Sequence, residues 1–136
     1  MRSGVVAVVL RGDKFLVIRR SQHVRAPGKY CFPGGSIEAG ETEQEAVVRE
    51  FSEELAGEVT PLARLWTSLT VTNVALVWWQ VSLPAEAALQ PNPLEVESFH
   101  WLTASEALAL PELLASNRDF YDAWQRGDFA ISADEH

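Results

Sequence analysis

The feature that most constrains this chain is a set of glutamates at helical spacing behind a glycine-rich segment. Glu50, Glu53 and Glu54 stand at positions i, i+3 and i+4, and residues 34–40 before them are rich in glycine. Side chains at these spacings share one face of an α-helix, where like charges repel at a cost of roughly 0.2–0.5 kcal/mol per exposed pair. Two interpretations follow: a solvated acidic face, or a set of oxygen ligands for a hard divalent cation.

The residues around the glutamates favour the second interpretation. Gly34 and Gly35 leave the backbone open, so that its carbonyl groups can approach a cation or a phosphate. Arg49 stands beside the cluster, and its planar guanidinium can orient a carboxylate or bind a phosphate. Mg2+ takes few protein carboxylates and bridges to substrate phosphates, which suits this combination.

The segment that carries the glutamates has the signals of a helix start and stop. Thr42 and Glu45 form a Thr-x-x-Glu capping box, and acidic residues in the first turn suit the helix dipole. Gly57 is the expected terminator. The apolar residues at i, i+4 and i+8 form a stripe that would face the core: Val47, Phe51 and Leu55.

Apolar runs elsewhere predict strands at residues 5–10, 15–18, 59–70, 74–83 and 96–102. Thr103 is expected to open a short helix, and Pro111 to stand in the first turn of a last helix. A polar tail from Ser132 is expected to fray. Strands and helices are mixed without a regular βαβ repeat. The pattern predicts an α+β fold, an α/β/α sandwich with a mixed sheet flanked by helices, as a single domain over residues 1–136.

Composition excludes several classes of function. The net charge of −8 disfavours binding of a nucleic acid polymer, and an anionic substrate would need local cations. No stretch approaches the roughly 20 apolar residues that a membrane span needs, and the run at residues 5–10 is too short for a signal segment. The lone Cys31 permits no internal disulfide, which predicts a cytoplasmic protein with a buried, inert thiol.

One stretch of the chain resembles a known family signature. Residues 35–41 read Gly-Ser-Ile-Glu-Ala-Gly-Glu, and after seven residues 49–54 read Arg-Glu-Phe-Ser-Glu-Glu. This resembles the Nudix box, G-x5-E-x7-R-E-U-x-E-E-x-G-U with U a bulky aliphatic residue, and Phe32-Pro33-Gly34 resembles its usual lead-in. Phe51 departs from the aliphatic position. Ala56 and Gly57 depart from the last two, so the glycine that ends the helix is displaced by one residue.

The resemblance implies a metal site and the residues around it. Mg2+, with Mn2+ as an alternative, would be bound by Glu50, Glu53 and Glu54 with help from the Gly34 carbonyl. Glu50 would also be a candidate general base, Arg49 would orient Glu50, and Glu41 would brace the loop against the helix. Such families often recruit one more carboxylate from outside the box, for which Glu95 is the candidate and Glu97 its rival.

The implied activity is that of an enzyme: hydrolysis of the pyrophosphate bond of a nucleoside diphosphate derivative by a metal-activated water. The short chain resembles MutT-like members, which implies a nucleoside triphosphate converted to a monophosphate and pyrophosphate. Two alternatives remain: an inactive nucleotide-binding module, motivated by Ala56-Gly57, and a hydrolase of coenzyme A or another dinucleotide-type substrate. The expected partner is a small nucleotide, not a membrane, and the protein would be a monomer or a homodimer.

Candidate substrate residues are fewer. Arg20 and Arg25 would meet phosphates or only solvent. Asn117 resembles a base-reading asparagine, but its place in Ser116-Asn117-Arg118-Asp119 favours a helix cap over that role. At most one of the tryptophans at 66, 78 and 79 is expected to stack on a base, because neighbouring strand residues alternate between core and surface. His23 and His100 are expected to have no catalytic role.

Overall fold

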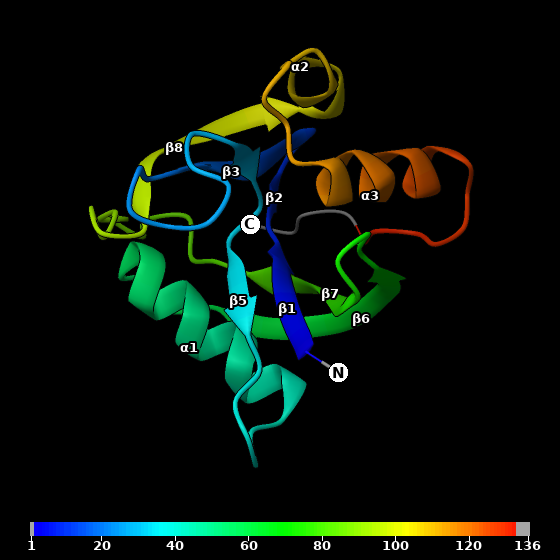
Figure 1. Ribbon diagram of the computed structural model, residues 1–136. Helices are drawn as coiled ribbons and strands as arrows, with labels where there is room; N and C mark the ends of the chain where they lie inside the picture. The colour runs from blue at the N-terminus through cyan, green and yellow to red at the C-terminus, as the bar shows by residue number, and fades with distance from the viewer. Residues whose placement is uncertain (1, 133–136) are drawn as a thin grey trace.

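The computed structural model describes residues 2–132 and builds a layer of strands between helices (Figure 1). Most of the predicted polar tail, residues 133–136, lies outside the described part. One sheet has the strand order β5-β1-β7-β6. In the second sheet, β3 is the central strand and pairs with β2, β4 and β8. β1 pairs with β7 in parallel and with β5 antiparallel, so the predicted mixed sheet is confirmed. The strands are β1 Arg2–Val8, β2 Leu10–Arg11, β3 Lys14–Arg20, β4 Tyr30–Cys31, β5 Gly34–Ser36, β6 Thr60–Leu69, β7 Val74–Ser82 and β8 Val96–Thr103.

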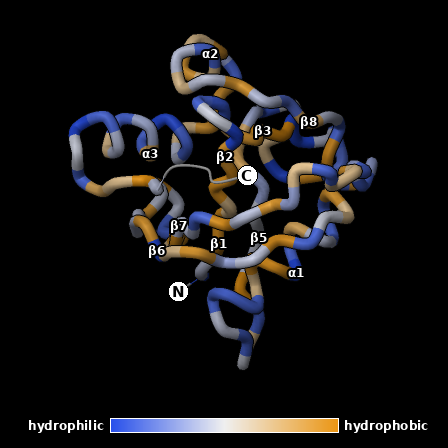
Figure 2. Tube along the Cα trace, turned by 180° about the vertical axis from the view of Figure 1, so that it is seen from behind, coloured by the Kyte–Doolittle hydropathy of each residue, from blue (hydrophilic) through white to orange (hydrophobic). Residues whose placement is uncertain are grey.

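Helices cover both faces of the strands. α1 (Glu43–Leu55) lies on one side, while α2 (Ala104–Leu108) and α3 (Ala115–Gln125) lie on the other. Along β1, Val5 and Ala7 face the α1 side and Val6 and Val8 face the α3 side, and all four are buried. β3 divides its residues between the same two clusters, so the two sheets act as one layer with a core on each face. Figure 2 shows the hydrophobic colour along these central strands.

The end of α1 differs from the prediction. Ala56, not Gly57, takes the left-handed conformation (φ +57°), and its N–H donates to the Ser52 carbonyl. Gly57 serves close packing instead, because a Cβ atom there would lie 2.7 Å from the Phe51 ring and 2.8 Å from Leu89. The prediction of Gly57 as terminator was therefore wrong, although the helix ends where that prediction placed it.

The start of the last helix was also predicted wrongly. Pro111 lies before α3, which begins at Ala115. The intervening segment runs beside β4 instead: the Tyr30 N–H donates to the Glu112 carbonyl, and the Leu114 N–H donates to the Tyr30 carbonyl, both at 2.9 Å. This extra pairing holds the backbone extended, so the helix begins about one turn later in the chain than Pro111. Thr103, by contrast, opens α2 as predicted, and it forms a capping box with Glu106.

The segment after α3 is held against β7 by the side chain of Gln80. The buried Gln80 amide donates from Nε2 to the Ser132 carbonyl at 2.9 Å and accepts from the Ser132 N–H at 3.1 Å, as a strand neighbour would. Phe129 stacks on Trp66, with ring centroids 5.7 Å apart. The segment up to Ser132 therefore packs against the core on the α3 side, with Phe129 and Ile131 partly buried on it. Among the described residues, no helix is both long and apolar enough to cross a membrane.

Replacing Gln80 with an apolar side chain should loosen this segment. Gln80→Leu keeps the side-chain size but removes both bonds to Ser132, and should lower the free energy of unfolding by about 1–3 kcal/mol. Urea unfolding followed by tryptophan fluorescence measures the loss. Ser132→Ala is the matched control, because the bonds use only its backbone. Equal stability of Gln80→Leu and the unmodified protein would contradict this role of Gln80.

Candidate active site

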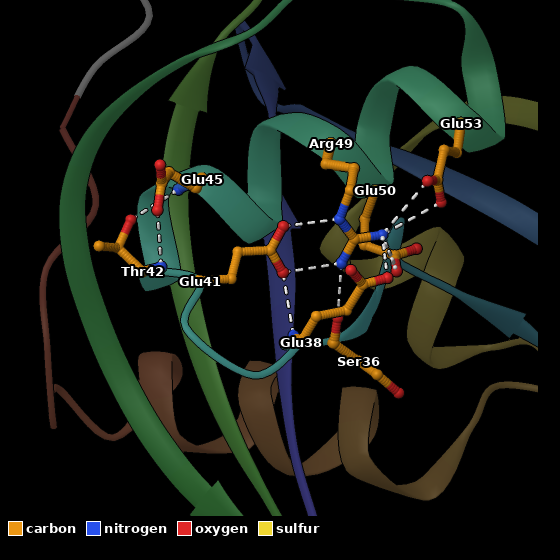
Figure 3. A network of polar contacts seen from close by, with 8 residues as sticks. All are labelled: Ser36, Glu38, Glu41, Thr42, Glu45, Arg49, Glu50 and Glu53. Atoms are coloured by element: carbon orange, nitrogen blue, oxygen red, sulfur yellow. Dashed lines mark hydrogen bonds and ion pairs between the residues drawn. The ribbon is translucent and has the colours of Figure 1, made fainter.

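The N-terminal cap and the buried stripe of α1 fix how the helix faces the sheet. The Thr42 hydroxyl accepts from the Glu45 N–H at 3.1 Å, and the Glu45 carboxylate accepts from the Thr42 N–H at 2.9 Å (Figure 3). The predicted stripe is fully buried: Val47, Phe51 and Leu55. With that face against the core, Glu50 and Glu54 are also buried and lie toward β5, whereas Glu53 is exposed.

β5 is an edge strand, and α1 takes the place of the missing neighbour. On either side of β5, the Pro33 carbonyl and the Ile37 N–H bond to the backbone of β1. In this antiparallel register the backbone groups of Gly34 and Ser36 therefore face the open edge. The Gly34 N–H donates to Glu54 Oε1 at 2.8 Å, and the Ser36 carbonyl accepts from Arg49 Nη2 at 2.9 Å. The Gly34 carbonyl faces the same edge, because N–H and C=O of one strand residue point the same way.

Gly35 makes room for a carboxylate. A Cβ atom on Gly35 would stand 2.3 Å from the Glu50 carboxyl carbon, well inside any allowed contact. The glycine therefore allows the carboxylate to lie directly against the strand backbone, which explains why Glu50 is buried although it carries a charge.

Arg49 links the loop before α1 to the helix through hydrogen bonds to several carboxylates (Figure 3). Its Nε and Nη2 donate to the two oxygens of Glu41 at 2.6 and 2.9 Å. Its Nη1 donates to Glu50 at 2.9 Å and to Glu53 at 3.2 Å. The bidentate bond lowers the pKa of Glu41 to about 2, and the carboxylates raise the pKa of Arg49. Glu41 thus braces the loop, and Arg49 contacts Glu50 as an orienting residue would.

The two buried carboxylates are poorly compensated. Burial raises the pKa of Glu54 to about 8, against the opposing hydrogen bond from Gly34, and burial also raises the pKa of Glu50. The negative charge of Glu95 adds to both shifts. Hard oxygen donors that repel one another in a partly dry site fit a divalent cation in charge and in ligand type.

The carboxylates do not converge on one point. Within residues 2–132, no three side chains of His, Cys, Asp or Glu gather closely enough to form a ready-made metal site. The reason is that other groups hold them: Glu53 is bonded to Arg49, and Glu54 to the Gly34 N–H. The donor set fits a cation, and a rotation of Glu53 would be needed to complete it.

Glu95 and Glu97, the two candidates for an additional ligand, differ in their surroundings. Glu95 lies near the cluster, since its charge acts on both Glu50 and Glu54. Glu97 instead pairs with Arg19, with 3.4 Å between Nη1 and Oε2. Of the two rivals, only Glu95 is placed where an additional ligand would be useful, and its role stays a prediction.

A cavity of about 260 Å3 adjoins the cluster and shares Gly34 and Gly35 as part of its wall. Its lining includes Arg2, Arg20 and Arg25, and no Asp or Glu belongs to the described residues around it. Arg20 is held in place, because its Nε donates to the Arg25 carbonyl at 2.6 Å. A protein of net charge −8 thus presents a cationic hollow beside its buried carboxylates. Arg2 was not singled out by the sequence, because no local pattern links it to the other two.

Asn117 reaches this cavity from α3. It is only 2% exposed, and its Nδ2 has no hydrogen-bond partner. The N-cap of α3 is Leu114, so the alternative that Asn117 caps the helix is wrong. An unpaired buried donor is costly, which makes this amide a group prepared for a ligand.

The comparison with known proteins decides the family. The family model described as "NUDIX domain" matches residues 1–124. The chain belongs to the Nudix family. A Mycobacterium tuberculosis (strain CDC 1551 / Oshkosh) protein named "Putative 8-oxo-dGTP diphosphatase 2" is 42% identical over 106 residues, spanning 75% of this chain and 73% of that protein.

Solved structures of similar proteins agree with the fold. A MutT protein from Methanosarcina mazei Go1 has a TM-score of 0.76 at 25% identity, covering 93% of this chain and 94% of that one. The ORF135 protein of E. coli has a TM-score of 0.74 at 26% identity, covering 98% and 95%. The resemblance to the Nudix family, the expected fold class and the assignment as a hydrolase are therefore confirmed.

The aromatic candidates lie outside the cavity of this Nudix hydrolase. Trp78 and Trp79 are buried in opposite cores, and Trp66 packs on Trp78 and Phe129, so none of them lines the hollow. His100 shares a hydrogen bond with the Ser98 hydroxyl at 2.9 Å. His23 is exposed. Among the described residues that line the cavity, the aromatic side chain is that of Phe32.

Cys31 lies in the wall of the cavity and provides a test by pH. Burial raises the pKa of its thiol from 9.0 to about 11, more than the nearby Arg20 lowers it. At pH 8 the folded protein should therefore react with iodoacetamide about a hundredfold more slowly than the same protein in urea, and the difference should shrink as the pH approaches 11. Mass spectrometry of this single cysteine follows the reaction. Rapid labelling of the folded protein at pH 8 would contradict the raised pKa.

Proposed function

We propose that this Nudix hydrolase cleaves a nucleoside or deoxynucleoside triphosphate to a monophosphate and pyrophosphate with Mg2+. The observation that carries the proposal is the shared wall at Gly34 and Gly35, with buried carboxylates on one side and an arginine-lined cavity on the other. A molecule in the cavity would have its phosphates between the arginines and the carboxylates. We expect such an enzyme, with its unpaired cysteine, to work in the cytoplasm.

The cavity suits a nucleotide in charge and in hydrogen bonding. Arg20 and Arg25 would bind phosphate oxygens, which the acidic remainder of the protein would repel. Asn117 would offer its free N–H to an acceptor atom on the base, because burial leaves it no water to bond with. The name of the M. tuberculosis relative supports oxidised purine nucleotides as the first substrates to test.

The carboxylates and Arg49 would carry the chemistry. Mg2+, or Mn2+ in its place, would be held by Glu50, Glu53 and Glu54 with the Gly34 carbonyl and Glu95, and would supply positive charge that activates water and neutralises phosphate oxygens. Glu50 would accept the proton of the attacking water, held in place by Arg49 and by the space over Gly35. Glu41 would keep Arg49 fixed.

The observation that suggested an inactive binding module does not support that alternative. The suggestion rested on Ala56 and Gly57 in place of the usual ending, yet Ala56 closes α1 with a bond to Ser52, and Glu53 and Glu54 remain in the last helical turn. Coenzyme A and dinucleotides remain as competing substrates within the test that follows.

A hydrolysis screen tests the chemistry. With Mg2+, at least one canonical or oxidised nucleoside triphosphate should release pyrophosphate faster than coenzyme A, dinucleotides or sugar nucleotides, and chelation of the metal should stop the release. Glu53→Gln should lower kcat by about a hundredfold or more, since it removes a charge that would bind the metal. Glu97→Gln is the control, because that side chain pairs with Arg19. Full activity of Glu53→Gln would refute the assignment.

The same assay tests the cavity. Asn117→Leu keeps the side-chain size but removes the free amide, and should raise KM for the best triphosphate about tenfold while leaving kcat within a few-fold. Gln125→Leu is the control, because it replaces an exposed amide on the same helix that lies outside the cavity lining. An unchanged KM for Asn117→Leu would remove Asn117 from the proposed site.

A further inference from the structure

One nitrogen of Arg49 serves more carboxylates than it has protons. Nη1 lies 2.9 Å from Glu50, 3.2 Å from Glu53 and 3.7 Å from Glu38, although it carries only two N–H groups. The other two nitrogens are committed, Nε to Glu41 and Nη2 to Glu41 and to the Ser36 carbonyl. Arg49 thus has a fixed side, which ties the loop to α1, and a shared side, which faces the glutamates (Figure 3).

The three glutamates of the cluster differ in how firmly they are held. The Glu50 side chain is 11% exposed and lies against Gly35, and the buried Glu54 is bonded to the Gly34 N–H. Glu53 is 50% exposed. Its hydrogen bonds to Arg49, at 3.2 and 3.3 Å, are the longest that Arg49 makes to a carboxylate. Glu53 is therefore the carboxylate that can turn at least cost.

We infer that Arg49 is a built-in counter-cation that competes with the divalent metal for Glu53. This inference rests on the proposed function, because it takes the glutamates to be the metal ligands. Without metal, Nη1 relieves the repulsion among the carboxylates and holds Glu53 away from Glu54. When metal binds, Glu53 leaves Nη1, while the bonds of Arg49 to Glu41 and Ser36 stay. Arg49 is then a positioning residue that keeps the cluster folded and weakens its metal affinity.

A purely structural brace would predict the opposite effect on metal affinity. If Arg49 did no more than orient the carboxylates, its removal would loosen them and weaken metal binding. If it also competes, removing its charge frees Glu53 and makes the cluster more negative, so that a cation binds more tightly. The direction of the change in Kd therefore separates the two roles, and it needs no turnover of substrate.

The experiment is a titration of the nucleotide-free protein with Mn2+, by calorimetry or by the spin-resonance signal of free Mn2+. Arg49→Met should bind Mn2+ about tenfold more tightly than the unmodified protein. Arg49→Lys, which keeps the charge, should stay within about twofold. Arg64→Met is the matched control: it removes the same charge from an arginine paired with Glu43 at the far end of α1, and should leave Kd unchanged.

Each outcome decides a separate question. Equal or weaker binding by Arg49→Met, or equal tightening in Arg64→Met, overturns the competition. A crystal structure of the unmodified protein with Mn2+ gives an independent answer if Arg49→Met fails to fold: Glu53 should lie more than about 4 Å from Nη1 with the Glu41 bonds kept. Persistence of the 3.2 Å contact overturns the inference. Absence of Mn2+ binding by the unmodified protein would refute the proposed function itself, and the inference with it.

Discussion

The site depends on the way α1 closes the open edge of β5. An edge strand leaves alternate N–H and C=O groups without partners, and such groups are costly when they are removed from water. Here the Glu54 carboxylate and the Arg49 guanidinium satisfy Gly34 and Ser36. The same two residues belong to the signature motif of the family, so the contacts that seal the sheet also set the position of α1. Strand and helix could not separate without exposing both.

The order of the strands places the carboxylates of α1 and the arginines of the cavity on different elements. The carboxylates project from α1 toward β5, while the arginines at 2, 20 and 25 come from β1, the end of β3 and the loop after it. β5 lies between the two groups, and its glycines keep the barrier thin. The positive charge of Arg20 acts on Glu54 across this boundary, but burial outweighs it and keeps the pKa of Glu54 raised.

Local patterns in the sequence predicted the parts of the fold that depend on neighbours in the chain. The cap at Thr42, the stripe at Val47 and Phe51 and most strand positions follow from residues a few positions apart, and the structure bears them out. The errors arose where distant segments meet. Pro111 has the propensity of a helix start, but pairing with Tyr30 overrides it. The arginine cavity was similarly hidden, since Arg2 and Asn117 become neighbours only through the tertiary fold.

The parallel pairing of β1 with β7 has a consequence for how the protein is made. All the family-signature residues lie within the first 57 positions, yet β1 acquires its parallel partner only from residues 74–80. A nascent chain that has just emerged through α1 carries every signature glutamate and both strands of the β1–β5 pair, but it lacks β7, on which β1 rests, and β8. Closing such a long loop costs entropy before any contact repays it, so completion of the sheet beneath the carboxylate cluster belongs to the late, non-local stage of folding.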